Sequence, residues 1–248
     1  MTDLFEYFRT DLRPKAEMLS DSYQNARPFP HVVIDDFLPL DVAESMLDLF
    51  PEPSYAHFEQ PDFKTHQVKK LGRVQESYFE GIDPWLRTTL FEFNSMAFLD
   101  FLEILTGIDG LIADPHFKGG AFHQILPGGK LDVHADFNVD VRRLLLRRIN
   151  VLVYLNKDWK PEYHGELELW SEDMRSAVVR VPPDFNRCVI FNTTSTSFHG
   201  HPIELASPPG VTRKSIALYY YSSDVSVFRA ETRHSTLWQD PFETNSKR

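Results

Sequence analysis

The stretch RINVLVYLN at residues 148–156 is one of several similar runs that decide the fold of this chain. It is rich in β-branched and aromatic residues, and similar runs separated by turn residues follow one another from about residue 115 onward. The others are AFHQIL (121–126), LDVHAD (131–136), GELELW (165–170), VVRV (178–181), RCVIF (187–191) and KSIALYYY (214–221), with the turn signal PGG between the first two. Several short strands of this kind are typical of a sandwich or jelly roll. We therefore expect a mainly β (α+β) fold with a double-stranded β-helix (jelly-roll) core.

The first part of the chain carries helical patterns instead. Apolar residues recur at roughly helical spacing over residues 3–26, and residues 32–37 are predicted to form a short strand. A helix is then predicted from Asp41 to Leu47, with Asp41 as its N-cap and Glu44 completing a capping box. These N-terminal helices are expected to pack around the β core.

A longer helix is predicted after Asp83–Pro84, where a capping residue precedes a proline at the first helical position. Apolar residues then recur at helical steps over 85–105, up to Gly107. By contrast, residues 52–83 are polar and aromatic without a clear period, and a connection of this length is usually functional or flexible. We interpret it as a candidate substrate lid.

The chain of 248 residues shows no internal repeat, low-complexity tract or flexible linker, so we expect one domain. Within it, residues 1–114 are predicted to be a helical and lid support region. Residues 115–228 would form the jelly-roll catalytic core, and residues 229–248 a C-terminal extension.

Composition argues against several classes of partner and location. A formal net charge of -10 would repel a phosphate backbone, so no nucleic-acid partner is expected. Cys188 is the only cysteine, which precludes an intramolecular disulfide or a thiolate metal cluster and fits a reducing cytoplasm. The first residues lack the pattern of a signal peptide, and no stretch is long and apolar enough to span a bilayer. We expect a cytoplasmic protein that does not contact membranes, with its oligomeric state left open.

The sequence His134-Ala135-Asp136 offers two potential metal ligands. Their side chains are two residues apart, so on an extended segment both point to the same face and can reach one ion. A third ligand must come from another strand, and His199 and His201 are the candidates. We prefer His199, because it directly follows a β-like run, whereas His201 precedes a proline at the start of a loop.

Two histidines and one carboxylate with open positions form the facial triad of non-haem Fe(II) oxygenases. Structural zinc would need cysteines that this chain lacks, and magnesium or calcium sites favour oxygen ligands. A catalytic zinc site remains open on ligand type alone, although the His-Glu-x-x-His helix of common zinc proteases is absent. Asp136 also fills the position that a halogenating subclass of these oxygenases leaves empty for a halide.

A possible anion anchor follows downstream. Arg213 and Ser215 lie on the same face of the strand predicted from RKSIALYYY, so a guanidinium and a hydroxyl could bind one carboxylate together. An exposed arginine beside Lys214 is the alternative interpretation.

In combination, these residues resemble the Fe(II)- and 2-oxoglutarate-dependent oxygenases, especially the prolyl 4-hydroxylase-like branch, over about residues 115–228. That family has His-x-Asp, a distal His, and then an Arg or Lys on the next strand, often as Arg-x-Ser. In the same order, this chain supplies His134, Asp136, His199, Arg213 and Ser215. Tyr154, in a Tyr-Leu-Asn turn before Gly165-Glu166-Leu167, is similar to a family tyrosine that contacts 2-oxoglutarate.

Three departures from the family pattern stand out. His164 replaces the first glycine of Gly-Gly-Glu-Leu at a turn. Gln124 stands near the position where the family often has a tyrosine contacting 2-oxoglutarate, and it could substitute only with altered geometry. The 14 residues from His199 to Arg213 exceed the usual interval and imply an extended loop.

The resemblance implies Fe(II), 2-oxoglutarate and dioxygen as cofactor and cosubstrates, with ascorbate as a further candidate. The implied reaction couples oxidative decarboxylation of 2-oxoglutarate to hydroxylation of an unactivated C–H bond, with a prolyl residue as one candidate substrate. A free amino acid or another small metabolite is the alternative, so the partner is a small-molecule or peptidyl substrate. A jelly-roll module that binds a ligand such as carbohydrate, through aromatics including Trp159 and Trp170, is the alternative from a different class.

Candidate substrate contacts are more widely spread. They include the 52–83 segment and the side chains of Asn138, Trp170, Arg142, Arg143, Arg147 and Arg148. For most of the four arginines, a solvated sheet edge is the expected setting.

Overall fold

Thirteen strands form one continuous sheet in the computed structural model, which describes residues 2–59, 65–74, 77–223 and 233–239. The strands are β1 (His31–Ile34), β2 (Phe58–Glu59), β3 (Gln67–Arg73), β4 (Ile112–Ala113), β5 (Ala121–Ala135), β6 (Val139–Asp140), β7 (Leu145–Tyr154), β8 (Leu167–Trp170), β9 (Ala177–Val181), β10 (Arg187–Asn192), β11 (His199–His201), β12 (Arg213–Ser222) and β13 (Leu237–Trp238). The helices are α1 (Leu4–Tyr7), a π-helical turn (Phe8–Leu12), α2 (Arg13–Gln24), α3 (Leu40–Asp48), α4 (Pro84–Glu92), α5 (Met96–Thr106) and a 3-10 turn (Pro161–Tyr163).

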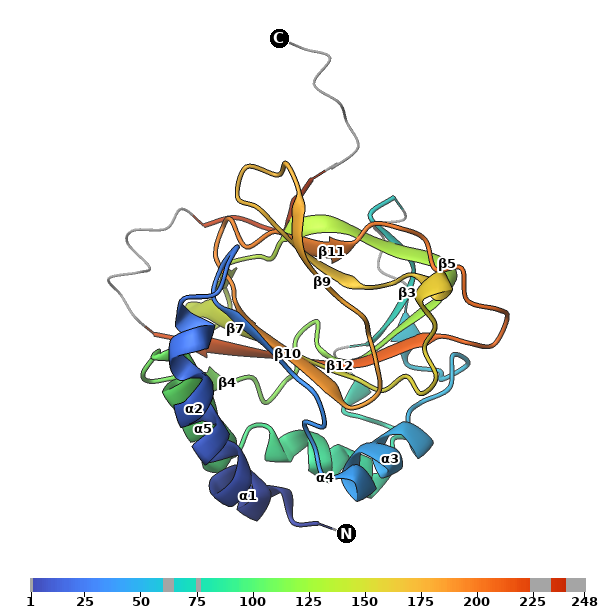
Figure 1. The fold of residues 1–248 in the computed structure, drawn as a ribbon. Helices are drawn as coiled ribbons and strands as arrows, with labels where there is room; N and C mark the ends of the chain where they lie inside the picture. The colour runs from blue at the N-terminus through green and yellow to red at the C-terminus, as the bar shows by residue number, and fades with distance from the viewer. Residues whose placement is uncertain (1, 60–64, 75–76, 224–232, 240–248) are drawn as a thin grey trace.

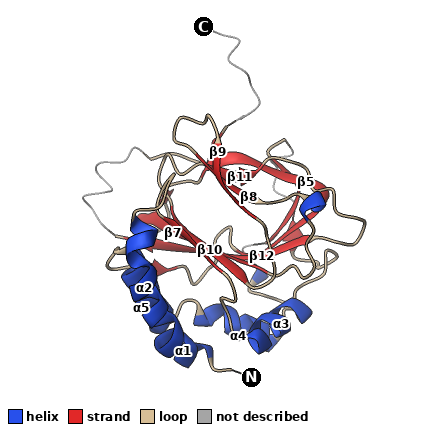
Figure 2. Ribbon diagram, in the orientation of Figure 1, coloured by secondary structure: helices blue, strands red, loops and turns tan. Residues whose placement is uncertain are grey.

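The sheet follows the order β1-β10-β7-β12-β5-β11-β8-β9, and neighbouring strands on this path are antiparallel. Figure 1 shows how it curls, so that β7, β10 and β12 form one layer and β5, β9 and β11 face them. Strand β8, which is labelled in Figure 2, lies in the second layer between β11 and β9. Strand β5 lies between β12 and β11, both of which come much later in the chain. Such non-local antiparallel pairing is characteristic of a jelly roll, and the predicted fold class is confirmed.

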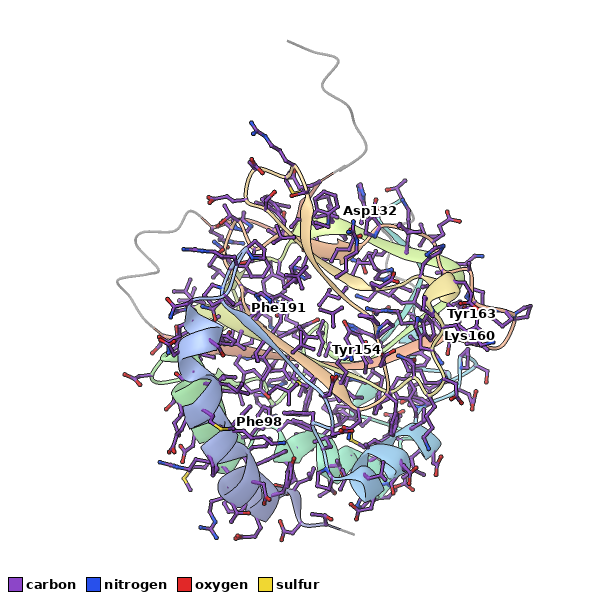
Figure 3. The ribbon with its side chains drawn as sticks, in the orientation of Figure 1. Phe98, Asp132, Tyr154, Lys160, Tyr163 and Phe191 are labelled. Atoms are coloured by element: carbon purple, nitrogen blue, oxygen red, sulfur yellow. The ribbon has the colours of Figure 1, made fainter. Side chains whose placement is uncertain are left out.

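Helices α1 to α5 cover the outer face of the layer formed by β7, β10 and β12 (Figure 2). The main hydrophobic core lies between these helices and that layer. Phe98 of α5 is fully buried there, and its ring centroid lies 4.8 Å from that of Phe8 and 5.9 Å from that of Tyr220 on β12 (Figure 3). The prediction that N-terminal helices pack around the β core is therefore confirmed.

The single helix predicted over 85–105 is wrong, because two helices occupy this stretch. Asp83 caps α4 as predicted, accepting a hydrogen bond from the backbone nitrogen of Trp85 at 2.8 Å. The chain then turns, and the Ser95 hydroxyl accepts from the nitrogen of Phe98 to begin α5. Serine side chains that bond nearby backbone favour caps over helix interiors, which explains the break. Gly107 ends α5 in the left-handed conformation, with φ 70.

The capping box predicted at Asp41 and Glu44 is also wrong. Helix α3 begins at Leu40, with Pro39 at the N-cap and no side-chain cap. The Asp41 carboxylate accepts hydrogen bonds from the backbone nitrogen and hydroxyl of Thr2, at 2.7 and 3.0 Å. The side chain expected to cap the helix therefore binds Thr2, which is distant in sequence. The nearby strand predicted over 32–37 is shorter than expected, because β1 ends at Ile34.

The runs AFHQIL and LDVHAD, predicted as two strands around a PGG turn, belong to one strand, β5. Near residues 127–129 its pairing with β3 shifts in register, and Gly128 takes a φ of 74. The turn signal is therefore a local irregularity within a strand, because strands on both flanks continue to pair with it.

The candidate lid at 52–83 contains regular structure that its pattern did not reveal. Residues 60–64 and 75–76 lie outside the described residues. Strand β3 pairs with β5 from Gln67 opposite Leu131 to Gly72 opposite His123. A wall of the β core therefore comes from this segment, and its role as a lid stays a prediction.

Of the predicted C-terminal extension 229–248, the described part is residues 233–239, in which β13 pairs with β5. Among the described residues, the helices are all too short or too polar to cross a bilayer.

We predict that Phe98→Ala lowers the free energy of unfolding by about 3–5 kcal/mol, because it removes a fully buried ring from an aromatic cluster. Met96→Ala is the control, because Met96 lies on the same helix but is 67% exposed. Its cost should stay within about 0.5 kcal/mol. Urea denaturation measures both values, and equal losses would contradict this packing.

Candidate metal centre

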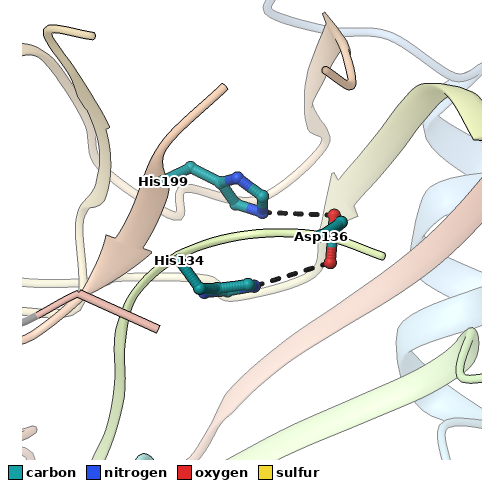
Figure 4. A group of neighbouring side chains, drawn as sticks. All are labelled: His134, Asp136 and His199. Atoms are coloured by element: carbon teal, nitrogen blue, oxygen red, sulfur yellow. Dashed lines mark ion pairs between the residues drawn. The ribbon is translucent and has the colours of Figure 1, made fainter. Parts of the chain in front are cut away.

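Three potential metal ligands converge at the end of β5. His134 lies on β5, Asp136 directly follows it, and His199 begins β11 opposite His134. One ligand atom from each lies within 4.8 Å of the others. The Nε2 atoms of His134 and His199 each lie 3.5 Å from an oxygen of Asp136 (Figure 4). The structure thus brings together the three residues that the sequence pattern selected.

A bulge places these side chains on the cavity side. His199 pairs with His134 but His201 pairs with Leu131, so two residues of β5 lie opposite Gly200 alone. The extra residue changes which alternate side chains face inward. A Cβ at Gly200 would lie 2.9 Å from the carbonyl oxygens of both Leu131 and Asp132, and only glycine avoids that contact.

Both histidine rings are fixed with Nε2 toward Asp136. The Nδ1 of His134 lies 2.9 Å from the carbonyl oxygen of Asp132, and that of His199 lies 2.9 Å from the carbonyl oxygen of Ser197. A carbonyl only accepts, so each Nδ1 donates and each neutral ring keeps its lone pair on Nε2. This is how backbone carbonyls orient histidine metal ligands.

His201, the alternative third ligand, lies outside this three-residue group. It is buried on the wall of the same cavity, but its two ring nitrogens have no hydrogen-bond partner among the described residues. It therefore lacks the carbonyl contact that orients the other two rings.

Arg147 forms an ion pair with the carboxylate of the group. Its Nη2 lies 2.9 Å from Oδ2 of Asp136, and its Nε and Nη2 donate to Oδ1 of Asn150. Its guanidinium lies 3.6 Å from the ring centroid of Tyr219. The Nδ2 of Asn150 donates to the same Asp136 oxygen at 2.8 Å. Arg147 is buried, so the solvated edge expected for most of the four arginines does not apply to it.

The charge of this network sets the protonation states. Burial raises the pKa of Asp136, but the charge of Arg147 outweighs it and holds the pKa well below its usual range. Burial lowers the pKa of His199 to about 4, and the neighbouring His134 contributes to this. At neutral pH the site therefore offers a carboxylate and a neutral imidazole, the forms that bind metals.

Arg213, Ser215 and Tyr154 form a second polar group. On β12, Arg213 lies opposite Ile125 of β5, and Ser215 lies opposite both His123 and Tyr154. The buried Arg213 donates from Nε to the carbonyl oxygen of Gly165 at 2.7 Å and from Nη2 to the Tyr154 hydroxyl at 3.2 Å.

Gly165 makes room for this arginine. A Cβ there would lie 2.5 Å from Leu205 and 3.2 Å from Cδ of Arg213, and the residue has a φ of 84. The glycine of the GELELW run is thus needed for close packing against Arg213. His164, which replaces the family's first glycine, lies at the turn as expected, with a φ of 59.

One cavity of about 340 Å³ connects the two groups. His134, Asp136 and His199 line one part of it, and Arg213 and Ser215 line another. This volume lies near the lower end of the range for small-molecule sites.

The suggestion that Gln124 stands in for a family tyrosine is wrong. Gln124 is fully buried, and its Nε2 donates to the Thr212 hydroxyl at 2.8 Å, on the face of β5 opposite to His123 and Ile125. His123 and Ile125 line the cavity instead. The strand alternation was a usable signal, because residues 123 and 125 share a face and 124 does not.

Lys70 lines the cavity, and the sequence analysis included it only as part of the 52–83 segment, without singling it out. Its strand, β3, lies within the segment that showed no clear period. Arg147 also lines the cavity, whereas two other candidate substrate contacts, Trp170 and Asn138, do not. Trp170 packs in a separate cluster with Val133 and Phe198, and the carbonyl oxygen of Asn138 accepts from the backbone nitrogen of Arg147.

The remaining arginines of the predicted basic cluster have surface roles. Arg143 pairs with Asp140 at 2.7 Å, and Arg148 donates to the Ser222 hydroxyl at 3.1 Å. Arg142 is exposed, in agreement with the solvated edge expected for most of these residues.

Comparison with known proteins gives an independent view of this geometry. Residues 120–221 match the family described as the 2OG-Fe(II) oxygenase superfamily. No curated protein matches the chain.

Among solved structures, a Pseudomonas putida prolyl-4-hydroxylase aligns with a TM-score of 0.58 at 16% identity, covering 84% of this chain and 100% of its own. A Trichoplax adhaerens prolyl hydroxylase, in complex with a hypoxia inducible factor peptide fragment, aligns with a TM-score of 0.59 at 18% identity, covering 88% and 96%. A Phytophthora capsici prolyl 4-hydroxylase aligns with a TM-score of 0.56 at 20% identity, covering 95% and 71%. At these identities the likeness shows the shared fold.

We predict that Arg147→Gln weakens metal binding by about ten- to a hundred-fold, because it removes the cation that holds the Asp136 carboxylate. Arg148→Gln is the matched control, since the neighbouring arginine bonds Ser222 outside the site. Anaerobic equilibrium titration with Fe(II) gives both affinities. Equal affinities in the two variants would contradict the assigned role of Arg147.

Proposed function

We propose which residues bind the metal and the cosubstrate. The premise is that the chain carries a 2OG-Fe(II) oxygenase domain at residues 120–221 and is an Fe(II)- and 2-oxoglutarate-dependent dioxygenase. His134, Asp136 and His199 bind Fe(II), and Arg213 with Ser215 binds the far carboxylate of 2-oxoglutarate. The observation that carries this proposal is the single cavity that both groups line.

The donor set fits iron. Two Nε2 lone pairs and a carboxylate face one point and leave further positions open, which is the facial-triad pattern. When bound, Fe(II) with 2-oxoglutarate supplies the oxidative decarboxylation that activates dioxygen for hydroxylation of a C–H bond. Ligand type alone would also admit catalytic zinc, and the family match favours iron.

Arg147 and Asn150 prepare the carboxylate for this task. Both bond Oδ2 of Asp136, which holds the group in one orientation and keeps it ionised. Oδ1 receives neither of these two bonds and faces Nε2 of His134. We infer that Oδ1 is the oxygen available to the metal.

Arg213 supplies a rigid, dry anchor. Its Nε donates to Gly165 and its Nη2 donates to Tyr154, and these bonds fix the plane of the guanidinium. Its Nη1 is left to bind a ligand. The Ser215 hydroxyl lies on the same face of β12 and can donate to the same carboxylate. Tyr154 then acts mainly through Arg213, because its hydroxyl already accepts from that side chain.

For the substrate we propose two candidates, and one is a prolyl residue, supported by the shared fold with the prolyl hydroxylases of Pseudomonas putida and Trichoplax adhaerens. The other is a free amino acid or other small metabolite, favoured by the small cavity. Ascorbate is a proposed reductant. We also propose that the protein works in a reducing compartment such as the cytoplasm, because its buried cysteine Cys188 is unpaired.

We further propose the organisation expected from the sequence, with residues 1–114 as support and residues 115–228 as the catalytic core. The binding-module alternative lacks such support, because Trp170 is buried in its own cluster and the Trp159 indole donates to the carbonyl oxygen of His164.

Anaerobic addition of Fe(II) and 2-oxoglutarate to the protein tests the function. We expect a weak visible charge-transfer band, and succinate formation after dioxygen is admitted. If neither is found, the assignment of the cavity to iron and cosubstrate is wrong.

Substitution of each histidine separates the two candidates for the third ligand. We predict that His199→Ala loses tight Fe(II) binding and that His201→Ala retains it, because His199 Nε2 faces Asp136 and His201 lies outside the group. Iron content after desalting measures both. Retention by His199→Ala with loss by His201→Ala would reverse the assignment.

We predict that Arg213→Gln raises the KM for 2-oxoglutarate by at least about thirty-fold, because it removes a buried cation from an anionic cosubstrate. Lys214→Gln, which alters the neighbouring partly exposed cation, is the matched control and should change the KM by less than about two-fold. Succinate formation at varied 2-oxoglutarate gives both constants. A similar KM in the two variants would place the cosubstrate elsewhere.

A further inference from the structure

The cavity contains a lysine that the tasks described above do not use. Lys70 of β3 lies opposite Ile125 of β5, and Arg213 of β12 lies opposite the same Ile125 on the other side. Neighbouring strands are about 4.8 Å apart, so the Cα atoms of Lys70 and Arg213 are separated by roughly 10 Å. Because directly paired residues share a face, both cations point into the cavity that they line.

Within the described residues, the Lys70 ammonium has neither a hydrogen bond nor an ion pair, whereas the guanidiniums of Arg147 and Arg213 have several. Desolvation lowers the pKa of Lys70 to about 8, and the charge of Asp136 opposes this. Lys70 is half-buried on the cavity wall, so its ammonium is partly desolvated and is stabilised by a ligand that accepts its hydrogen bonds.

His201 gives a second, independent observation. It is 2% exposed and lines the same cavity, yet both of its ring nitrogens have no partner among the described residues. Buried polar atoms in folded proteins nearly always have partners, so an unpartnered ring on a cavity wall indicates a polar ligand.

The charges of the loaded cavity leave a surplus of positive charge. Bound Fe(II) and 2-oxoglutarate would cancel each other, and Asp136 is neutralised by Arg147. Glu59 and Arg73, which also line the cavity, carry opposite charges. Lys70 and Arg213 remain, and each is able to hold an anion.

The two cations differ in how they are held. Arg213 is fixed by Gly165 and Tyr154 and has Ser215 beside it, which suits the carboxylate of a cosubstrate that binds in every turnover. Lys70 is a flexible point charge on the opposite side of Ile125. One far carboxylate of 2-oxoglutarate satisfies Arg213 and leaves Lys70 available for another group.

We propose that Lys70, assisted by His201, binds an anionic group of the substrate, so that this enzyme selects a small acid and not a neutral molecule. The inference rests on the proposed function, because it assumes that 2-oxoglutarate occupies Arg213. It favours a free amino acid or a related acid over an internal prolyl residue, whose carboxyl group is in a peptide bond.

The test measures binding to the anaerobic Fe(II)- and 2-oxoglutarate-loaded protein by calorimetry. The probes are acid and amide pairs, namely acetate with acetamide, L-proline with L-prolinamide and L-leucine with L-leucinamide, and inorganic phosphate. We expect at least one acid to bind more tightly than its amide. Binding of phosphate alone, with the same dependence on Lys70, would identify a phosphate-bearing substrate.

We predict that Lys70→Met weakens binding of the preferred anion by about ten- to a hundred-fold, the usual effect of losing a charged hydrogen bond. The same substitution should change the affinity for 2-oxoglutarate by less than about two-fold. His201→Ala should weaken binding of the anion by about two- to ten-fold, and this variant should still bind iron. Lys69→Met is the matched control, because that exposed lysine donates to the carbonyl oxygen of Pro127, and it should bind as the unchanged protein does.

Several results would overturn the inference. The first two are equal binding of acids and their amides, and the absence of binding by every anion. The others concern Lys70→Met: an unchanged affinity for the anion, or an affinity for 2-oxoglutarate that falls as much as in Arg213→Gln. Failure of the unchanged protein to bind 2-oxoglutarate is a separate result, which would overturn the proposed function and this inference together.

Discussion

The bulge where β11 meets β5 is the constraint on which the site depends. Two residues of β5 lie opposite Gly200, so the inward-facing side chains change from odd to even positions along the strand. His123 and Ile125 therefore line the same cavity as His134 and Asp136. Without the extra residue, a regular strand would turn one of these pairs away from the cavity. The strand that carries His123 and Ile125 on the cavity wall could not then also carry His134 there.

The burial of charge in pairs is the second organising feature. Asp136 is ionised in a buried place because Arg147 and Asn150 bond it, and Arg147 in turn lies against Tyr219. A buried carboxylate without such partners would bind a proton, and the neutral carboxyl group would be a poor metal ligand. Lys70 differs, because among the described residues it has no such partner, which is why we assign it a ligand.

Parts of this arrangement could be predicted from the sequence because they follow from local periodicity. The alternation of a strand places His134 and Asp136 on one face, and the same rule places Arg213 with Ser215. Runs of β-branched and aromatic residues identified most core strands. The choice of His199 rested on its position directly after such a run, and the structure brings it to the other two ligands.

The remaining features depend on contacts distant in sequence. Strand β3 was hidden because its residues, which include Lys70, pair with β5 without an apolar pattern of their own. Arg147 was one of four arginines of which most were expected at a solvated edge, and its ion pair with Asp136 joins β7 to the end of β5. Likewise, the capping role given to Asp41 was lost to a contact with Thr2. Each of these outcomes was decided by tertiary pairing, which local patterns do not contain.

The most direct test of the account is a crystal structure of the protein grown anaerobically with Fe(II) and 2-oxoglutarate. The account predicts iron bound by Nε2 of His134, Nε2 of His199 and the carboxylate of Asp136, with the far carboxylate of 2-oxoglutarate on Arg213. It would be contradicted by iron on His201 in place of His199, or by 2-oxoglutarate bound away from Arg213.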